Sequence, residues 1–162
     1  MKLQLPAVLA ANEGYRRSAF SAAARTPQPA RHLVILTCMD ARLDLFRALG
    51  LEVGDAHILR NAGGRASADA IRSLVVSSHL LGTREVGVIH HTNCGLEGIT
   101  DREVAAKTGV DRMAFLAFPD LDTSVMDDVR TIRECGLLPD GFQSWGAVYD
   151  VDTGELRVVP PA

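Results

Sequence analysis

The sequence predicts an α/β fold: a mainly parallel central sheet of about four strands, flanked by helices and closed by a terminal antiparallel strand. Three observations support this fold class. Four short apolar runs are typical of strands, a segment of helical period separates the second run from the third, and a turn sequence divides the last part of the chain. With 162 residues, the chain is long enough for one domain, 1–162, with its own core.

The four strand-like runs are rich in β-branched and aromatic residues. The first three lack a clean apolar–polar alternation, as expected of strands that are buried on both faces. In chain order the runs are LVILT (33–37), AHILR (56–60), EVGVIH (85–90) and WGAVYDV (145–151).

The segment between the second and third runs, SADAIRSLVVSSHLLG, has apolar residues at helical spacing. It begins at Ser67, a plausible N-cap, and ends at Gly82. A strand, a helix and a strand of these lengths predict a right-handed crossover and parallel pairing of the two strands. The Asp-Thr-Gly sequence at 152–154 predicts a terminal hairpin.

The sequence determines two other regions less well. DREVAAK (101–107) and DTSVMDDVRTIREC (122–135) have helical patterns, and AFLAFPDLD (114–122) between them is typical of a loop over the core. Residues 1–30 are interpreted as a helical arm whose apolar start, LQLPAVLAA, docks on another surface; a cleaved signal peptide is the alternative.

Charge and composition exclude several function classes. The formal net charge is −3 and the arginines are spread along the chain, so nucleic acid is not an expected partner. No apolar run approaches the roughly 20 residues of a membrane helix, so no membrane association is expected. Three cysteines are too few for a disulfide framework, which favours the cytoplasm and a metal-ligating or nucleophilic role for a cysteine beside other polar ligands.

Two predicted strands are followed by residue types that can bind a metal or hold such a ligand in place. Cys38, Asp40 and Arg42 follow the first strand, and His91 and Cys94 follow the third. In an open parallel sheet, ligands bind at the carboxyl ends of the strands, near the point where the strand order reverses. Each residue alone has an ordinary structural explanation, but two thiolates, an imidazole and a carboxylate at two such ends predict a tetrahedral zinc site.

These motifs resemble those of the β-class carbonic anhydrases, and of the short members in particular. The resemblance consists of C-x-D-x-R at Cys38 to Arg42, R-N-A-G at Arg60 to Gly63, and H-x-x-C-G at His91 to Gly95. It covers residues from about 33 to 95 and, more loosely, the last strands.

The resemblance implies a zinc enzyme, a carbonate dehydratase. Zn²⁺ would be held by Cys38, His91 and Cys94, with Asp40 as either the fourth ligand or a gate and Arg42 as the partner of that carboxylate. The implied reaction is the reversible hydration of carbon dioxide to bicarbonate by zinc-bound hydroxide. Relatives of this kind form dimers in which the N-terminal helix lies across the partner, so a homodimer or a higher homo-oligomer is expected.

Two other functions fit the same motifs. Carbonyl sulfide or carbon disulfide hydrolases resemble this family, and the zinc motif does not separate them from carbonic anhydrases. In a non-catalytic zinc module, Asp40 would close a permanent four-ligand site. Arg42 argues against that module, because a purely structural site has no evident use for a guanidinium two residues from the ligand.

The remaining polar residues are interpreted as structural. RNAGG (60–64) lacks the spacing and the lysine of a phosphate-binding loop, so its glycines are expected to allow close backbone approach beside the metal. His57, His79 and His90 are expected to pack rather than to bind metal or to shuttle protons. Cys135 is expected to pack near a helix end.

Overall fold

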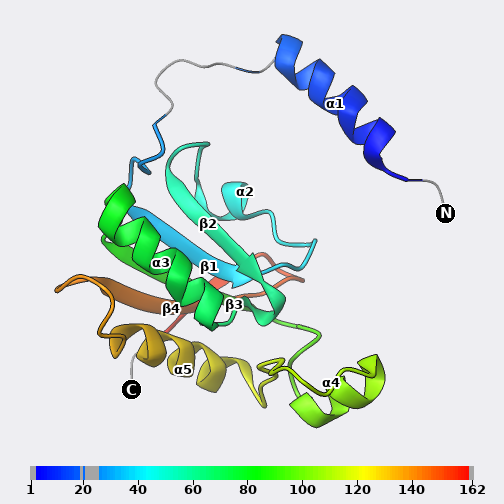
Figure 1. Ribbon diagram of the computed structural model, residues 1–162, viewed down its shortest axis with the longest axis vertical. Coiled ribbons are helices and arrows are strands. Elements are labelled where there is room, and N and C mark those ends of the chain that lie inside the picture. Colours follow the sequence, from blue (N-terminus) through cyan, green and yellow to red (C-terminus); the bar gives the residue numbers. More distant parts are fainter. Residues whose placement is uncertain (1–2, 19, 21–25, 161–162) are drawn as a thin grey trace.

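The computed structural model describes residues 3–18, 20 and 26–160, and it contains a five-stranded sheet with the order β2-β1-β3-β4-β5 (Figure 1). β1, β2, β3 and β4 are parallel, and β5 pairs with β4 in the antiparallel direction. The predicted fold class is therefore confirmed. The strands are β1 (Leu33–Cys38), β2 (Ala56–Asn61), β3 (Glu85–His91), β4 (Gln143–Tyr149) and β5 (Leu156–Val159).

The expected direct pairing of the second strand with the third is wrong. β2 and β3 are parallel, but each pairs with β1, which lies between them. The connecting helix α3 (Ala68–Leu81) therefore crosses over β1. Its predicted ends are confirmed: the Ser67 side chain accepts a hydrogen bond from the backbone of Ala70, and Gly82 is left-handed.

Two helices, α3 and α5 (Leu121–Arg133), cover one face of the sheet (Figure 1). Leu74 of α3 and Val125 of α5 are fully buried in a cluster with apolar side chains of β1 and β3. The contact between α5 and β4 is close at Gly146, where an added Cβ would lie 2.2 Å from a methyl group of Val125. This face holds the largest apolar cluster among the described residues.

The opposite face of the sheet packs against a short helix that the sequence patterns did not predict, α2 (Leu45–Leu49). The Asp44 side chain caps its N-terminus and the left-handed Gly50 ends it. Five residues are too few for helical periodicity to appear, which explains why the helix was missed.

The segment from 98 to 141 contains the two predicted helices and the predicted loop. α4 (Asp101–Thr108) begins with a capping box between Thr100 and Glu103, and α5 follows a loop that buries Phe118. Asp101 fastens the loop to α4, because its carboxylate accepts hydrogen bonds from the backbone N–H groups of residues 115, 116 and 117.

The N-terminal arm contains helix α1 (Leu5–Ser18), as expected. None of its residues is buried, and in Figure 1 it stands away from the sheet, so it does not dock on its own chain in the described structure. Residues 1–2, 19 and 21–25 of the predicted arm lie outside the described residues. Among the described helices, none has the length and apolar character that crossing a membrane requires.

Candidate metal centre

The strand order brings the two predicted ligand segments together. β1 has β2 on one side and β3 on the other, so the chain reverses direction across the sheet at the adjacent carboxyl ends of β1 and β3. Cys38 ends β1, His91 ends β3, and Cys94 follows three residues later. All three are buried, and their ligand atoms lie within 4.8 Å of one another. Such a set of two sulfurs and one imidazole nitrogen fits zinc.

The ring of His91 is oriented for metal binding. Its Nδ1 lies 2.9 Å from the carbonyl oxygen of Thr92 and therefore donates a hydrogen to it. The Nε2 atom then carries the free lone pair, and it is buried without a hydrogen-bond partner in the described structure. A buried acceptor that faces two thiols is costly to leave unpaired, and a metal ion at this point would satisfy it.

The two cysteine thiols shift each other's pKa in opposite directions. The neighbouring Cys94 thiol lowers the pKa of Cys38 to about 4, although burial acts in the opposite direction. Contact with Cys38, together with burial, raises the pKa of Cys94. Burial alone would lower the pKa of His91, but Cys38 and the Thr92 carbonyl outweigh it and raise that pKa. The protein alone therefore favours one thiolate, and a divalent cation would stabilise the second.

Asp40 lies beside this group but pairs with Arg42. The Nε atom of Arg42 donates to Oδ1 of Asp40 at 2.9 Å, and its Nη2 atom donates to Oδ2 at 2.8 Å. The guanidinium holds the pKa of Asp40 well below its usual range. Oδ2 also lies 3.9 Å from Nε2 of His91. The carboxylate thus has Arg42 as its partner and the candidate metal ligands as its neighbours.

The chain does not continue as an extended strand from Cys38 to Arg42. The chain turns after Asp40, because the Oδ1 atom of that residue accepts a hydrogen bond from the backbone N–H of Arg42 at 2.9 Å. Aspartate often accepts the N–H two residues ahead and so starts a turn. The turn, rather than strand alternation, brings the guanidinium to the carboxylate.

The R-N-A-G segment stabilises this turn through hydrogen bonds to its backbone. Arg60 donates to the carbonyl of Cys38 at 3.0 Å and to that of Asp40 at 2.5 Å. Gly64 is left-handed, with φ of 71°, and a Cβ there would lie 2.9 Å from the backbone nitrogen of Cys38. The expected close backbone approach beside the site is therefore present.

A buried ion pair next to the site escaped prediction from the sequence. Arg65 donates to Asp128 of α5 at 2.7 Å, and its guanidinium lies 5.4 Å from the ring centroid of Phe118. Phe118 packs with Cys38 and Cys94 in one apolar cluster. Arg65 and Asp128 are 63 residues apart, so no local pattern connects them. The one available signal is that Asp128 lies on the buried face of α5, where a carboxylate needs a partner.

The remaining histidines and Cys135 lie outside the candidate ligand group. His57 contacts Ser77 and the backbone of residue 27, and His79 contacts the carbonyl of residue 137. His90 is fully buried, with its Nε2 atom 3.2 Å from Asp128. Cys135 is partly buried just beyond α5.

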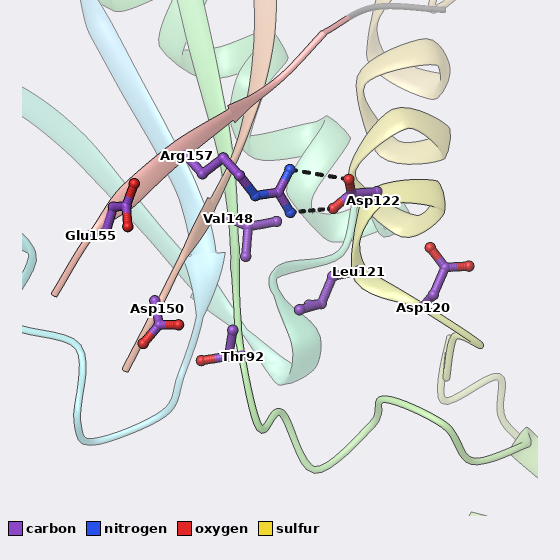
Figure 2. Close-up of a pocket in the computed structure, with 8 residues that line it drawn as sticks. All are labelled: Thr92, Asp120, Leu121, Asp122, Val148, Asp150, Glu155 and Arg157. Carbon is purple, nitrogen blue, oxygen red and sulfur yellow. Dashed lines mark hydrogen bonds and ion pairs between the residues drawn. The ribbon is translucent and has the colours of Figure 1, made fainter. Parts of the chain in front are cut away.

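A separate hollow of about 240 Å³ lies between α5 and the final hairpin (Figure 2). Three of its four carboxylates have structural partners: Asp122 pairs with Arg157, Asp120 caps α5, and Asp150 accepts backbone N–H groups of the hairpin turn. The hollow does not contain the candidate metal ligands. It is lined by Thr92, Asp120, Leu121, Asp122, Val148, Asp150, Glu155 and Arg157.

Comparison with known proteins agrees with this geometry. A model of the carbonic anhydrase family matches residues 33–116. β-Carbonic anhydrase 1 of Mycobacterium tuberculosis is 41% identical over 138 residues, which cover 82% of this chain and 85% of that protein. The chain belongs to the β-carbonic anhydrase family. This confirms the predicted family and, with it, the enzyme class of the lyases known as carbonate dehydratases.

Two further relatives bear on structure and substrate. A crystal structure of carbonic anhydrase from Streptococcus mutans superposes with a TM-score of 0.88 at 41% identity and covers 99% of both chains. A carbon disulfide hydrolase of Acidianus is 33% identical over 156 residues, which cover 78% of this chain and 76% of that protein. The carbon disulfide hydrolases are thus the more distant of these relatives.

Proposed function

We propose that this carbonic anhydrase binds Zn²⁺ through Cys38, His91 and Cys94 and hydrates carbon dioxide reversibly to bicarbonate. The observation that carries this proposal is the buried group of two thiols and one imidazole with the Asp40 carboxylate beside it, held by Arg42. A permanent four-ligand structural site would need Asp40 in the ligand group, so the pairing of Asp40 with Arg42 outside that group supports the catalytic site.

The protein groups have distinct roles in this proposal. Zn²⁺ bound by three protein ligands would lower the pKa of a water molecule in the fourth position to about 7. With Asp40 drawn aside by Arg42, its carboxylate would accept a hydrogen bond from that water and orient it. Carbon dioxide is apolar, and the cluster around the thiols, which includes Phe118 and Leu45, provides apolar walls. Arg42 touches the carboxylate and acts through it.

A stopped-flow assay that offers carbon dioxide, carbonyl sulfide and carbon disulfide to the same zinc-loaded protein tests the substrate. We expect rapid hydration of carbon dioxide, because the more similar relatives are named carbonic anhydrases. Faster turnover of carbon disulfide than of carbon dioxide would favour the hydrolase function instead. Absence of all three activities with full zinc would favour the structural module.

The metal assignment predicts that Cys94→Ser loses most of its zinc. A serine hydroxyl is not deprotonated near neutral pH as a coordinated thiol is, so one of the two anionic ligands would disappear. Elemental analysis of the purified variant measures this loss. Cys135→Ser is the matched control and keeps one zinc per chain; full zinc in Cys94→Ser would refute the assignment.

We also propose that the enzyme is a homodimer or a higher homo-oligomer of the cytoplasm. The exposed apolar residues of α1 support an assembly, and the free cysteines support a reducing compartment. We propose that residues 1–162 form one zinc domain and that 1–30 serve as its arm.

A further inference from the structure

Asn93, between His91 and Cys94, has an unusual backbone conformation. Its φ is 57°, and it is one of three non-glycine residues with positive φ in the described part of the chain. Residues with a Cβ disfavour this left-handed region, although asparagine tolerates it better than most. Such a conformation persists where the surrounding structure requires it, so its contacts show what it does.

The contact that matters is made by the backbone carbonyl of Asn93. It accepts a hydrogen bond from Nη2 of Arg42 at 3.0 Å, and the same Nη2 atom donates to Asp40. Among the described residues, Asp40 and the Asn93 carbonyl receive the hydrogen bonds of this guanidinium. The Arg42 side chain is 49% exposed, so packing alone does not hold it in place, and the Asn93 carbonyl gives it a second anchor besides Asp40.

The side chain of Asn93 contributes less than its carbonyl. Its Nδ2 atom donates to Asp152, in the turn after β4, at a longer 3.3 Å, and both residues are exposed. The carbonyl direction, in contrast, follows from the left-handed backbone. A residue that leaves this conformation would turn its carbonyl away from Arg42.

We propose that Asn93 is a positioning residue whose left-handed backbone aims its carbonyl at Arg42 and so keeps Asp40 drawn away from the metal position. This inference rests on the proposed function, because it requires Asp40 to act as a gate. It also couples the two ligand segments, since the segment that carries His91 and Cys94 anchors the arginine that follows Cys38. The gate can therefore open fully only when both segments are folded together.

The test uses protein loaded with Co²⁺ in place of zinc and titrated with thiocyanate, followed by visible absorption. Thiocyanate needs the fourth metal position and therefore reports whether Asp40 has left it. Asn93→Val disfavours the left-handed conformation, whereas Asn93→Gly adopts it freely and lacks only the side chain. We expect Asn93→Gly to bind thiocyanate as the wild type does, and Asn93→Val to bind it roughly tenfold more weakly, as Arg42→Ala does.

Each other outcome overturns a defined part of the argument. Wild-type thiocyanate affinity in Asn93→Val, or weak binding in Asn93→Gly, would overturn the role of the carbonyl. If Asn93→Val fails to hold cobalt, Asn93→Ala replaces it; cobalt loss there too would mean that the position only supports the metal ligands, and the inference would be wrong. Wild-type affinity in Arg42→Ala would refute the gate itself.

Discussion

At the scale of single residues, Asp40 has two competing partners. The structure has both carboxylate oxygens on the guanidinium of Arg42, with one of them 3.9 Å from a ring nitrogen of His91. A small rotation of one side chain would therefore exchange Arg42 for a metal ion. Arg42 lowers the pKa of Asp40 in the paired position, and even an ordinary carboxyl pKa of about 3.9 leaves the group ionised near neutral pH, so the partner of Asp40, not its protonation, decides its state there.

We predict that Arg42→Ala keeps its zinc but loses most of its activity. Without the guanidinium the pKa of Asp40 rises toward its ordinary value, yet the group stays ionised near pH 7 and free to occupy the metal. In the wild type, activity should rise with pH, because hydroxide displaces Asp40 from the fourth position better than water does. Zinc X-ray absorption across a pH series checks both; a constant carboxylate ligand in the wild type while activity climbs would disprove the gate.

Gly64 offers a second test at this scale. Gly64→Ala should weaken zinc binding, because its Cβ would overlap the backbone at Thr37 and Cys38 in addition to a strain of about 1–2 kcal/mol from the left-handed conformation. Gly98→Ala is the matched control, since Gly98 has φ of 67° but open space around its Cβ position. Zinc retention against a competing chelator measures the effect. Equal retention in the two variants would mean that the contact with Cys38 is unimportant.

The candidate ligands were predictable from the sequence because residue type and strand ends carry that information. Cys38 and His91 lie at the ends of buried strands, Cys94 follows the second of them, and parallel strands end at one edge of a sheet. The contacts of Asn93 and Arg65 were not predictable. They depend on a backbone angle and on a contact across 63 residues, and neither leaves a periodic pattern in the sequence.

At the scale of elements, Asp101 holds the loop after α4 and should make stability depend on acid. Its pKa is lowered, first by the backbone N–H of Ala117 and then by those of Phe115 and Leu116. A lowered folded-state pKa gives stability that is present above the unfolded pKa of about 3.9 and is lost as pH falls through the folded-state pKa.

The acid prediction can be measured as a difference in Tm. Asp101→Asn should melt below the wild type at pH 6, and the gap should narrow as the pH falls toward 3. Asp111→Asn changes an exposed carboxylate of the same segment and should have the same Tm as the wild type at every pH from 6 to 3. A gap for Asp101→Asn that is constant from pH 6 to pH 3 would show that its charge does not hold the loop.

At the scale of the whole molecule, the sequence predicted the elements better than their order. The strand runs, the ends of α3 and the final hairpin all follow from local patterns of caps, periods and turns. β1 lies between β2 and β3 in the sheet. Other parallel strand orders would have the same local sequence patterns, so these patterns do not determine the order. The observed order places Cys38 beside the end of β3, so the site depends on a feature that local sequence does not encode.

The proposed assembly involves α1, which has no buried residue although it carries an apolar face. Leu5, Val8 and Leu9 lie at helical spacing and are each about 60% exposed. A helix of 14 residues is marginal in water by itself, so a partner that covers this face would stabilise it. A second copy of the chain is the partner that the proposed dimer provides.

We therefore predict that the double variant Val8→Asp and Leu9→Asp is monomeric where the wild type is dimeric. Two carboxylates on the apolar face would have to be buried without partners in the interface, which costs more than the helix contact contributes. Ala7→Asp with Ala10→Asp is the matched control, because these positions lie on the opposite side of α1 and should leave the dimer intact. Sedimentation at micromolar concentration measures all three proteins. A wild type that sediments as a monomer with full activity would refute the proposed dimer. A dimer that persists in both double variants would instead place the interface on the sheet domain.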